Sequence, residues 1–87
     1  MKVVLKKKIV KAVRSMPKRE QALFDTLVRE IADLGPERTN WPNYSVLTNT
    51  HTHHCHLSYH WAACWFETIK GIEVEVTYVG SRENAPY

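Results

Sequence analysis

The sequence predicts an α+β fold in which two N-terminal helices pack on one face of a small, mainly antiparallel sheet. Apolar residues recur every three or four positions through residues 6–34, whereas from residue 44 onward they alternate every second position. The chain has 87 residues, of which 44% are hydrophobic, and this composition suits one modest core and argues against wholesale disorder. We therefore expect a single domain over residues 1–87, built as a helical layer on a sheet.

The N-terminal part predicts a short strand followed by a helical hairpin. Residues 2–5, KVVL, suit a short edge strand. The first helix is indicated by apolar residues at helical spacing, namely Ile9, Val10, Val13 and Met16. Pro17 suits the first turn of the second helix, KREQALFDTLVREIADL, which Gly35–Pro36 ends. Its apolar stripe, expected to be core, comprises Leu23, Leu27, Ile31 and Leu34, widened by Phe24 and Val28.

The C-terminal part predicts a meander of three antiparallel strands. These strands cover Tyr44–Thr48, His53–Trp65 and residues 72–79, with a turn at Lys70–Gly71. Strand side chains alternate between the two faces of a sheet. The odd set should face the helices: His53, Cys55, Leu57, Tyr59, Trp61, Ala63 and Trp65. The even set should occupy the opposite, open face: His54, His56, Ser58, His60, Ala62 and Cys64.

The last strand continues this division of side chains. Its core set is expected to be Ile72, Val74, Val76 and Tyr78, while Glu73, Glu75 and Thr77 join the open face. The open face therefore combines imidazoles, carboxylates and hydroxyls. Imidazoles can act as general acids or bases near neutral pH, and a nearby arginine such as Arg82 can hold a phosphate. The alternative is that these histidines are simply polar residues of a solvated strand.

A metal site is the other candidate, because residues 50–65 hold all five histidines and both cysteines. Zinc needs three or four ligands around one point. In a regular strand Cys55 points away from His54 and His56, and His60 lies roughly 20 Å along the strand from His54. The histidine pair then lacks a third ligand unless a bulge supplies one. We predict no metal and no other cofactor.

The charge distribution indicates the class of binding partner, and the cysteines indicate the cellular compartment. The first 19 residues carry eight basic side chains and no acidic one: Lys2, Lys6, Lys7, Lys8, Lys11, Arg14, Lys18 and Arg19. Such an end suits a phosphate backbone or an acidic protein, the alternative being a solvated helix face. The chain has neither an apolar run of about 18 residues nor a signal-peptide core, so no membrane association is expected. Two cysteines too distant to pair within one strand suit the reducing cytoplasm.

Several short motifs resemble the RelE/ParE toxin superfamily of bacterial toxin–antitoxin systems. They are NYSVL, HCHL, WAACW and the tail EVTYVGSRENAPY, and they are most similar to RelE- and HigB-like members. By motif the resemblance covers about half of the chain. It implies a RelE-like fold and a cytoplasmic toxin that cleaves mRNA on the ribosome without a metal. The ribose 2′-hydroxyl attacks the adjacent phosphate and leaves a 2′,3′-cyclic phosphate.

The resemblance also implies roles for individual residues. His54, His56, Arg82 and Tyr87 would form the catalytic group, with either histidine as the base and Tyr87 as an acid or a stacking ring. The resemblance assigns His60 to phosphate contact, and the basic charge of residues 1–19 adds Lys6, Lys7, Lys11 and Arg14 as predicted RNA-binding residues. Relatives often have histidine where this chain has Arg82, and a permanently charged guanidinium can stabilise a phosphorane but is a poor general acid.

The partners implied by the resemblance are a cognate antitoxin protein, mRNA and the ribosome, with DNA contacted only through the antitoxin complex. Two alternatives share the fold that it implies. ParE-like members poison DNA gyrase and cleave nothing, and other members are inactive and only bind an antitoxin. The histidines beside Arg82 favour the nuclease.

Overall fold

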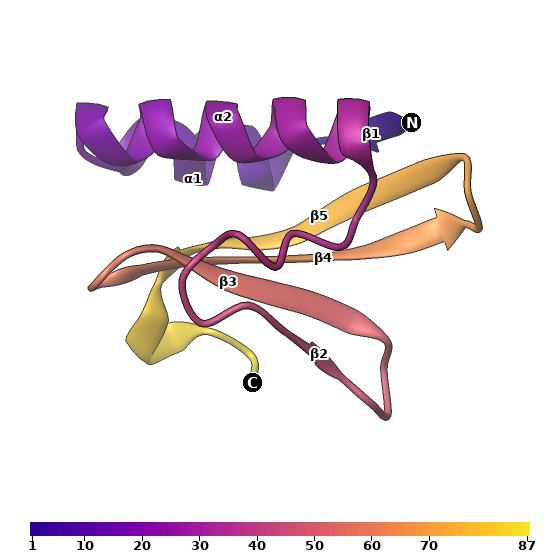
Figure 1. Cartoon of the computed structure of the whole chain (residues 1–87). Helices are drawn as coiled ribbons and strands as arrows, with labels where there is room; N and C mark the ends of the chain where they lie inside the picture. The colour runs from indigo at the N-terminus through magenta and orange to yellow at the C-terminus, as the bar shows by residue number, and fades with distance from the viewer.

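The computed structural model describes residues 1–87 as an α+β fold of two helices and a five-stranded mixed sheet, which confirms the predicted class (Figure 1). The strands are β1 (Lys2–Val4), β2 (Ser45–Leu47), β3 (Thr52–Ser58), β4 (Trp61–Ile69) and β5 (Glu73–Ser81). The helices are α1 (Lys7–Ser15) and α2 (Lys18–Leu34), and a single 3-10 turn, η1 (Arg82–Asn84), begins the C-terminal tail.

The strands lie in the order β1-β5-β4-β3-β2. Strands β2 to β5 follow one another as an antiparallel meander, because each is joined to the next by a short connection. The predicted N-terminal edge strand is present, and β1 pairs in parallel with β5. Both edges of the sheet are strands of only three residues, and such short edges offer little backbone for pairing with another chain.

The two helices and the sheet share one core of 13 buried residues. Figure 1 shows both helices on one side of the sheet and the C-terminal tail on the other. Leu27 and Ile31 of α2 are fully buried in this core together with Trp65 of β4 and Val74 of β5. The prediction that Leu34 is core is wrong. It is the last residue of α2 and is 68% exposed.

The predicted single strand His53–Trp65 is also wrong, since the chain reverses at Tyr59–His60 and forms β3 and β4. Neither turn residue is a glycine or asparagine, so the sequence gives no turn signal there. The division of faces survives, because odd residues pair with odd ones up to the register shift after His56, as in His53 with Trp65 and Cys55 with Ala63. Tyr59 is the exception and is 68% exposed at the turn.

A bulge in β5 changes the core set of the last strand. Cys64 pairs with Tyr78 but the next residue, Trp65, pairs with Val76, so Thr77 is an extra residue in β5. Beyond the bulge Val79 enters the core and Tyr78 turns to the open face. The prediction of Tyr78 as core is therefore wrong. So is that of Ile72, which precedes β5 in a turn and is 61% exposed.

The connection between α2 and β2 is held at three points. Glu30 Oε1 accepts hydrogen bonds from Asn40 Nδ2 and Trp41 Nε1, both at 2.9 Å. These bonds, first that from Asn40, lower the pKa of Glu30. Trp65 Nε1 donates to the carbonyl of Pro36 at 3.0 Å, and the His56 N–H donates to the carbonyl of Pro42 at 2.8 Å. The last bond fixes this connection beside β3, next to the candidate site.

Candidate functional site

Two neighbouring histidines of β3 lie on opposite faces of the sheet. His53 stacks on Trp65 in the core, with ring centroids 5.8 Å apart, and its Nδ1 is hydrogen-bonded to the hydroxyl of Tyr44 at 2.7 Å. His54 lies on the open face, where its Nε2 is hydrogen-bonded to Ser45 Oγ at 2.6 Å. Both histidines are only 8% exposed. His53 therefore packs on the core residue Trp65 while also lining a hollow next to Glu67, whereas His54 belongs to the predicted open face.

The ring that covers His54 is Tyr87, at the end of the C-terminal tail. The two rings are stacked, with centroids 4.1 Å apart and an angle of 15° between their planes. His54 Nδ1 is buried and has no hydrogen-bond partner. Burial, and then the electrostatic influence of the neighbouring His56, lowers the pKa of His54, so the His54 imidazole is neutral at pH 7. Burial likewise raises the pKa of the Tyr87 phenol, which keeps its proton.

A hollow of about 370 Å³ lies beside this stack on the open face. We call it the charged hollow, and it is lined by Pro42, Asn43, His56, Ser58, Tyr59 and Arg82. It brings together two of the four predicted catalytic side chains, His56 and Arg82. The other two, His54 and Tyr87, form the neighbouring stack and do not line it.

Backbone and side-chain contacts hold Arg82 at the charged hollow. Its N–H donates to the carbonyl of His60 at 2.9 Å, which ties the start of the tail to the β3–β4 turn. Its guanidinium lies 4.5 Å from the centroid of the Tyr59 ring, a cation–π contact. Tyr59 thus orients the one cation in the lining of this hollow.

The bulge in β5 also directs the tail. Tyr78, turned to the open face, folds back and donates its hydroxyl to the carbonyl of Ser81 at 2.6 Å. Glycine at position 80 permits this, because a Cβ there would lie 2.9 Å from Tyr78 Oη. Ser81 Oγ then accepts a hydrogen bond from the Glu83 N–H and begins η1. These contacts turn the tail back across the open face toward His54.

The residues predicted to bind RNA are not gathered at this site. His60 is exposed in the β3–β4 turn, where its ring meets the edge of Tyr59, and it does not line the charged hollow. Lys7, Lys11 and Arg14 lie on α1, on the helical side of the sheet (Figure 1). Lys6 is paired with Glu75 of β5 at 3.5 Å.

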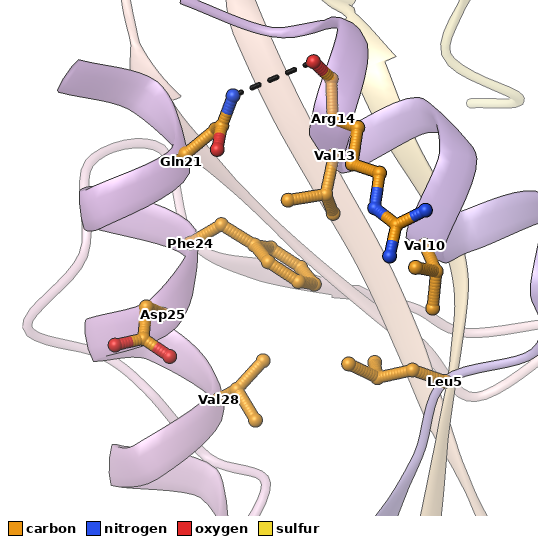
Figure 2. Close-up of a pocket in the computed structure, with 8 residues that line it drawn as sticks. All are labelled: Leu5, Val10, Val13, Arg14, Gln21, Phe24, Asp25 and Val28. Atoms are coloured by element: carbon orange, nitrogen blue, oxygen red, sulfur yellow. Dashed lines mark hydrogen bonds between the residues drawn. The ribbon is translucent and has the colours of Figure 1, made fainter. Parts of the chain in front are cut away.

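The helical side carries a second concave surface, which we call the helix groove. It has a volume of about 340 Å³ and lies between α1 and α2. Figure 2 shows Val10 and Val13 of α1 facing Phe24 and Val28 of α2, with Leu5 closing one end. Its polar lining residues are Arg14, Gln21 and Asp25. Lys7 and Lys11 line a further depression that shares Leu5, Val10 and Arg14 with the groove, so α1 gives this side a basic border.

The cysteines and acidic residues form neither a thiolate nucleophile nor a metal site. Cys55 lies in the helix-side core and Cys64 on the other face, and both are fully buried. Burial raises the pKa of Cys55 to about 12 and that of Cys64 to about 11, so neither forms a thiolate nucleophile at neutral pH. No group of three or more His, Cys, Asp and Glu side chains is arranged to hold a metal ion. Neither helix combines the length and apolarity needed to span a membrane.

Sequence reasoning missed four residues of the site. Tyr59 was assigned to the core, and Pro42, Asn43 and Ser45 were given no role, yet each lines the charged hollow or bonds to His54. Of these four residues, only Ser45 could have been found from strand alternation, and only if the register that pairs it with His54 were known.

Comparison with known proteins found no relative of this chain. No family model matches the chain, and no match was found among curated proteins or solved structures. The resemblance to toxins therefore rests on the short motifs of the sequence.

Proposed function

We propose that the protein is a RelE/ParE-like toxin of a type II toxin–antitoxin module and acts as a metal-independent endoribonuclease on ribosome-bound mRNA. One observation carries the proposal. The charged hollow combines an imidazole, a guanidinium and two hydroxyl-bearing side chains, and it lies on the face of the sheet that the helices leave uncovered. A RelE-like arrangement, with two helices packed on one face of the sheet, belongs to the same proposal.

The reaction needs a base, a cation and an acid. His56, in the charged hollow, takes the proton of the ribose 2′-hydroxyl as its oxygen bonds to phosphorus. Arg82 neutralises the charge that develops on the phosphorane oxygens. The bond from phosphorus to the 5′-oxygen then breaks, and this oxygen takes a proton from Tyr87, whose raised pKa keeps it protonated. The products are a 2′,3′-cyclic phosphate and a 5′-hydroxyl.

His54 has a different role from His56 in this scheme. When its Nε2–H donates to Ser45 Oγ, its Nδ1 has a free lone pair, but the atom is buried. His54 therefore supports Tyr87 by stacking and does not act as the base. This distinction resolves, as a proposal, the choice between the two histidines that the sequence leaves open.

The helix groove is a suitable binding site for the antitoxin that the proposal includes. An amphipathic antitoxin segment would place apolar side chains against Phe24 and Val28, and its acidic side chains beside Lys7, Lys11 and Arg14. Covering this groove would leave the charged hollow on the opposite side of the sheet free.

The test is cleavage of mRNA on ribosomes by the purified protein, with a gyrase supercoiling assay in parallel. We expect fragments with cyclic phosphate ends, formed equally with and without a chelator. His56→Ala should slow single-turnover cleavage by roughly 10²–10⁴-fold, the usual contribution of general acid–base catalysis. His51→Asn is the matched control, because it removes an imidazole at a positive φ that asparagine tolerates. Inhibition of supercoiling without RNA cleavage would replace the proposal with the gyrase poison.

A further inference from the structure

A second hollow on the open face, of about 420 Å³, lies on the other side of the Tyr87–His54 stack from the charged hollow. We call it the neutral hollow, and it is lined by Leu47, Asn49, Thr50, Thr52, Thr77, Pro86 and Tyr87. Its lining includes no charged side chain. Three threonine hydroxyls, the Tyr87 phenol and one carboxamide supply its hydrogen-bonding groups, and Leu47, Pro86 and the Tyr87 ring supply its apolar surface.

We infer that the neutral hollow binds a nucleobase of the RNA strand whose phosphate occupies the charged hollow, and that Asn49 and Thr52 select the base. This inference rests on the proposed function. Without a cation the hollow cannot neutralise the charge of a phosphate, whereas a nucleobase is neutral, planar and rich in hydrogen-bonding atoms along its edge. A carboxamide offers both a donor and an acceptor and can therefore bind a base edge at two points.

The spacing of the two hollows suits one continuous strand. Thr52, His54 and His56 follow one another along β3 at steps of two residues, so their side chains share one face. Thr52 lines the neutral hollow and His56 the charged hollow, about 13 Å apart at the usual strand rise. Single-stranded nucleic acids bind in this way, with the backbone near cations and the bases against aromatic rings.

The Tyr87–His54 stack shows that this surface accepts a planar ring. Tyr87 lies on the imidazole at a centroid distance of 4.1 Å and an angle of 15°, which is the arrangement of stacked bases and aromatic side chains. Tyr87 also forms one wall of the neutral hollow. A base that enters the hollow therefore has an aromatic ring beside it and the Asn49 and Thr52 side chains for its edge.

The experiment measures binding of 2′-deoxy tetranucleotides of A, C, G or U, which lack the attacking hydroxyl and cannot be cleaved. We expect wild-type protein to prefer one base by about 10-fold, equivalent to about 1.4 kcal/mol. Asn49→Ala and Thr52→Val should reduce this preference to less than about twofold. Thr26→Val, which removes an exposed threonine hydroxyl from α2, should keep it. Arg82→Ala should weaken binding of all four probes alike.

Two results would overturn the inference, and they are distinguishable. If the protein cleaves RNA but binds the four probes equally, or if Asn49→Ala and Thr52→Val keep the wild-type preference, the neutral hollow is not a base site and the proposed function stands. If no probe binds and no RNA is cleaved, the proposed function fails and the inference fails with it. Circular dichroism of each variant checks that a loss of preference does not reflect a loss of fold.

Discussion

His53 and His54 are neighbours in the chain and are equally exposed. His53 is hydrogen-bonded to the hydroxyl of Tyr44, just before β2, and His54 to the hydroxyl of Ser45, the first residue of β2. They differ in what covers them. Trp65, which covers His53, is itself fully buried between sheet and helices, whereas Tyr87, which covers His54, is 45% exposed and belongs to the tail. The same burial therefore has two origins: on one face the fully buried ring of Trp65, and on the other face a half-exposed ring of the C-terminal tail.

The largest expected effect is on the free energy of unfolding, which should fall much more when Trp65 is replaced than when Tyr87 is replaced. Trp65→Ala should reduce the free energy of unfolding by about 3–5 kcal/mol, because it leaves a large cavity in the core. Tyr87→Ala should cost about 1 kcal/mol, the value of a stacked aromatic pair at the surface. Urea denaturation measures both. A similar loss in the two variants would mean that the tail is as much a part of the core as β4.

The next effect concerns rate instead of stability. Arg82→Ala should keep the fold but lose about 2.7–4 kcal/mol of transition-state stabilisation, the usual cost of removing one preorganised donor. Single-turnover cleavage of ribosome-bound mRNA measures this loss. Arg29→Ala is the matched control, since Arg29 is paired only with Asp25 on the exposed surface of α2. If both arginine variants cleave at the wild-type rate, the charged hollow does not hold the scissile phosphate.

Tyr59→Leu should have a smaller effect on the same reaction. The substitution keeps an apolar side chain at the turn but removes the ring beneath the Arg82 guanidinium. Because a cation–π contact at an exposed site contributes about 0.5–1 kcal/mol, we expect cleavage to slow only severalfold. Tyr59→Phe should retain the wild-type rate because it keeps the ring. A slow Tyr59→Phe variant would instead assign a role to the phenol.

The smallest effect is on the pKa of one histidine, followed by NMR titration. Burial lowers the pKa of both His53 and His54 from the ordinary value of 6.5. Tyr87→Ala should raise the pKa of His54 toward that value, because it removes the cover, and should leave His53 unchanged. An unchanged His54 would show that residues other than Tyr87 keep water from its ring.

The same lowered pKa has a consequence for stability. As the pH falls below 6.5, the unfolded chain takes up protons at these positions before the folded protein does, so the stability present above pH 6.5 is lost as the pH falls through the folded pKa values. The loss should be smaller in Tyr87→Ala than in wild type, since one of the two pKa values is then closer to that of the unfolded chain.

Alternation alone was enough to predict that His53 and Cys55 lie on one face and His54 and His56 on the other. It failed where the backbone leaves the regular period: at the turn of Tyr59–His60, which lacks a turn-forming residue, and at the extra residue Thr77, which reverses the orientation of Tyr78 and Val79. The resemblance groups Tyr87 with His54, and the Tyr87 ring lies on His54 in the structure. The bulge and the Tyr78–Ser81 hydrogen bond that turn the tail back could not be predicted, because they depend on the register between β4 and β5.

The pairing of β1 with β5 has a consequence for the order of folding. The helical hairpin and the meander form from contacts between neighbouring segments, but residues 2–4 must find residues 73–75 at the far end of the chain. Closing so long a loop costs the most entropy and comes late in a search that favours local contacts. During synthesis β1 has no partner in this sheet until residues 73–75 have emerged. Arg82 and Tyr87 follow that partner, so the candidate site is assembled at the same late stage.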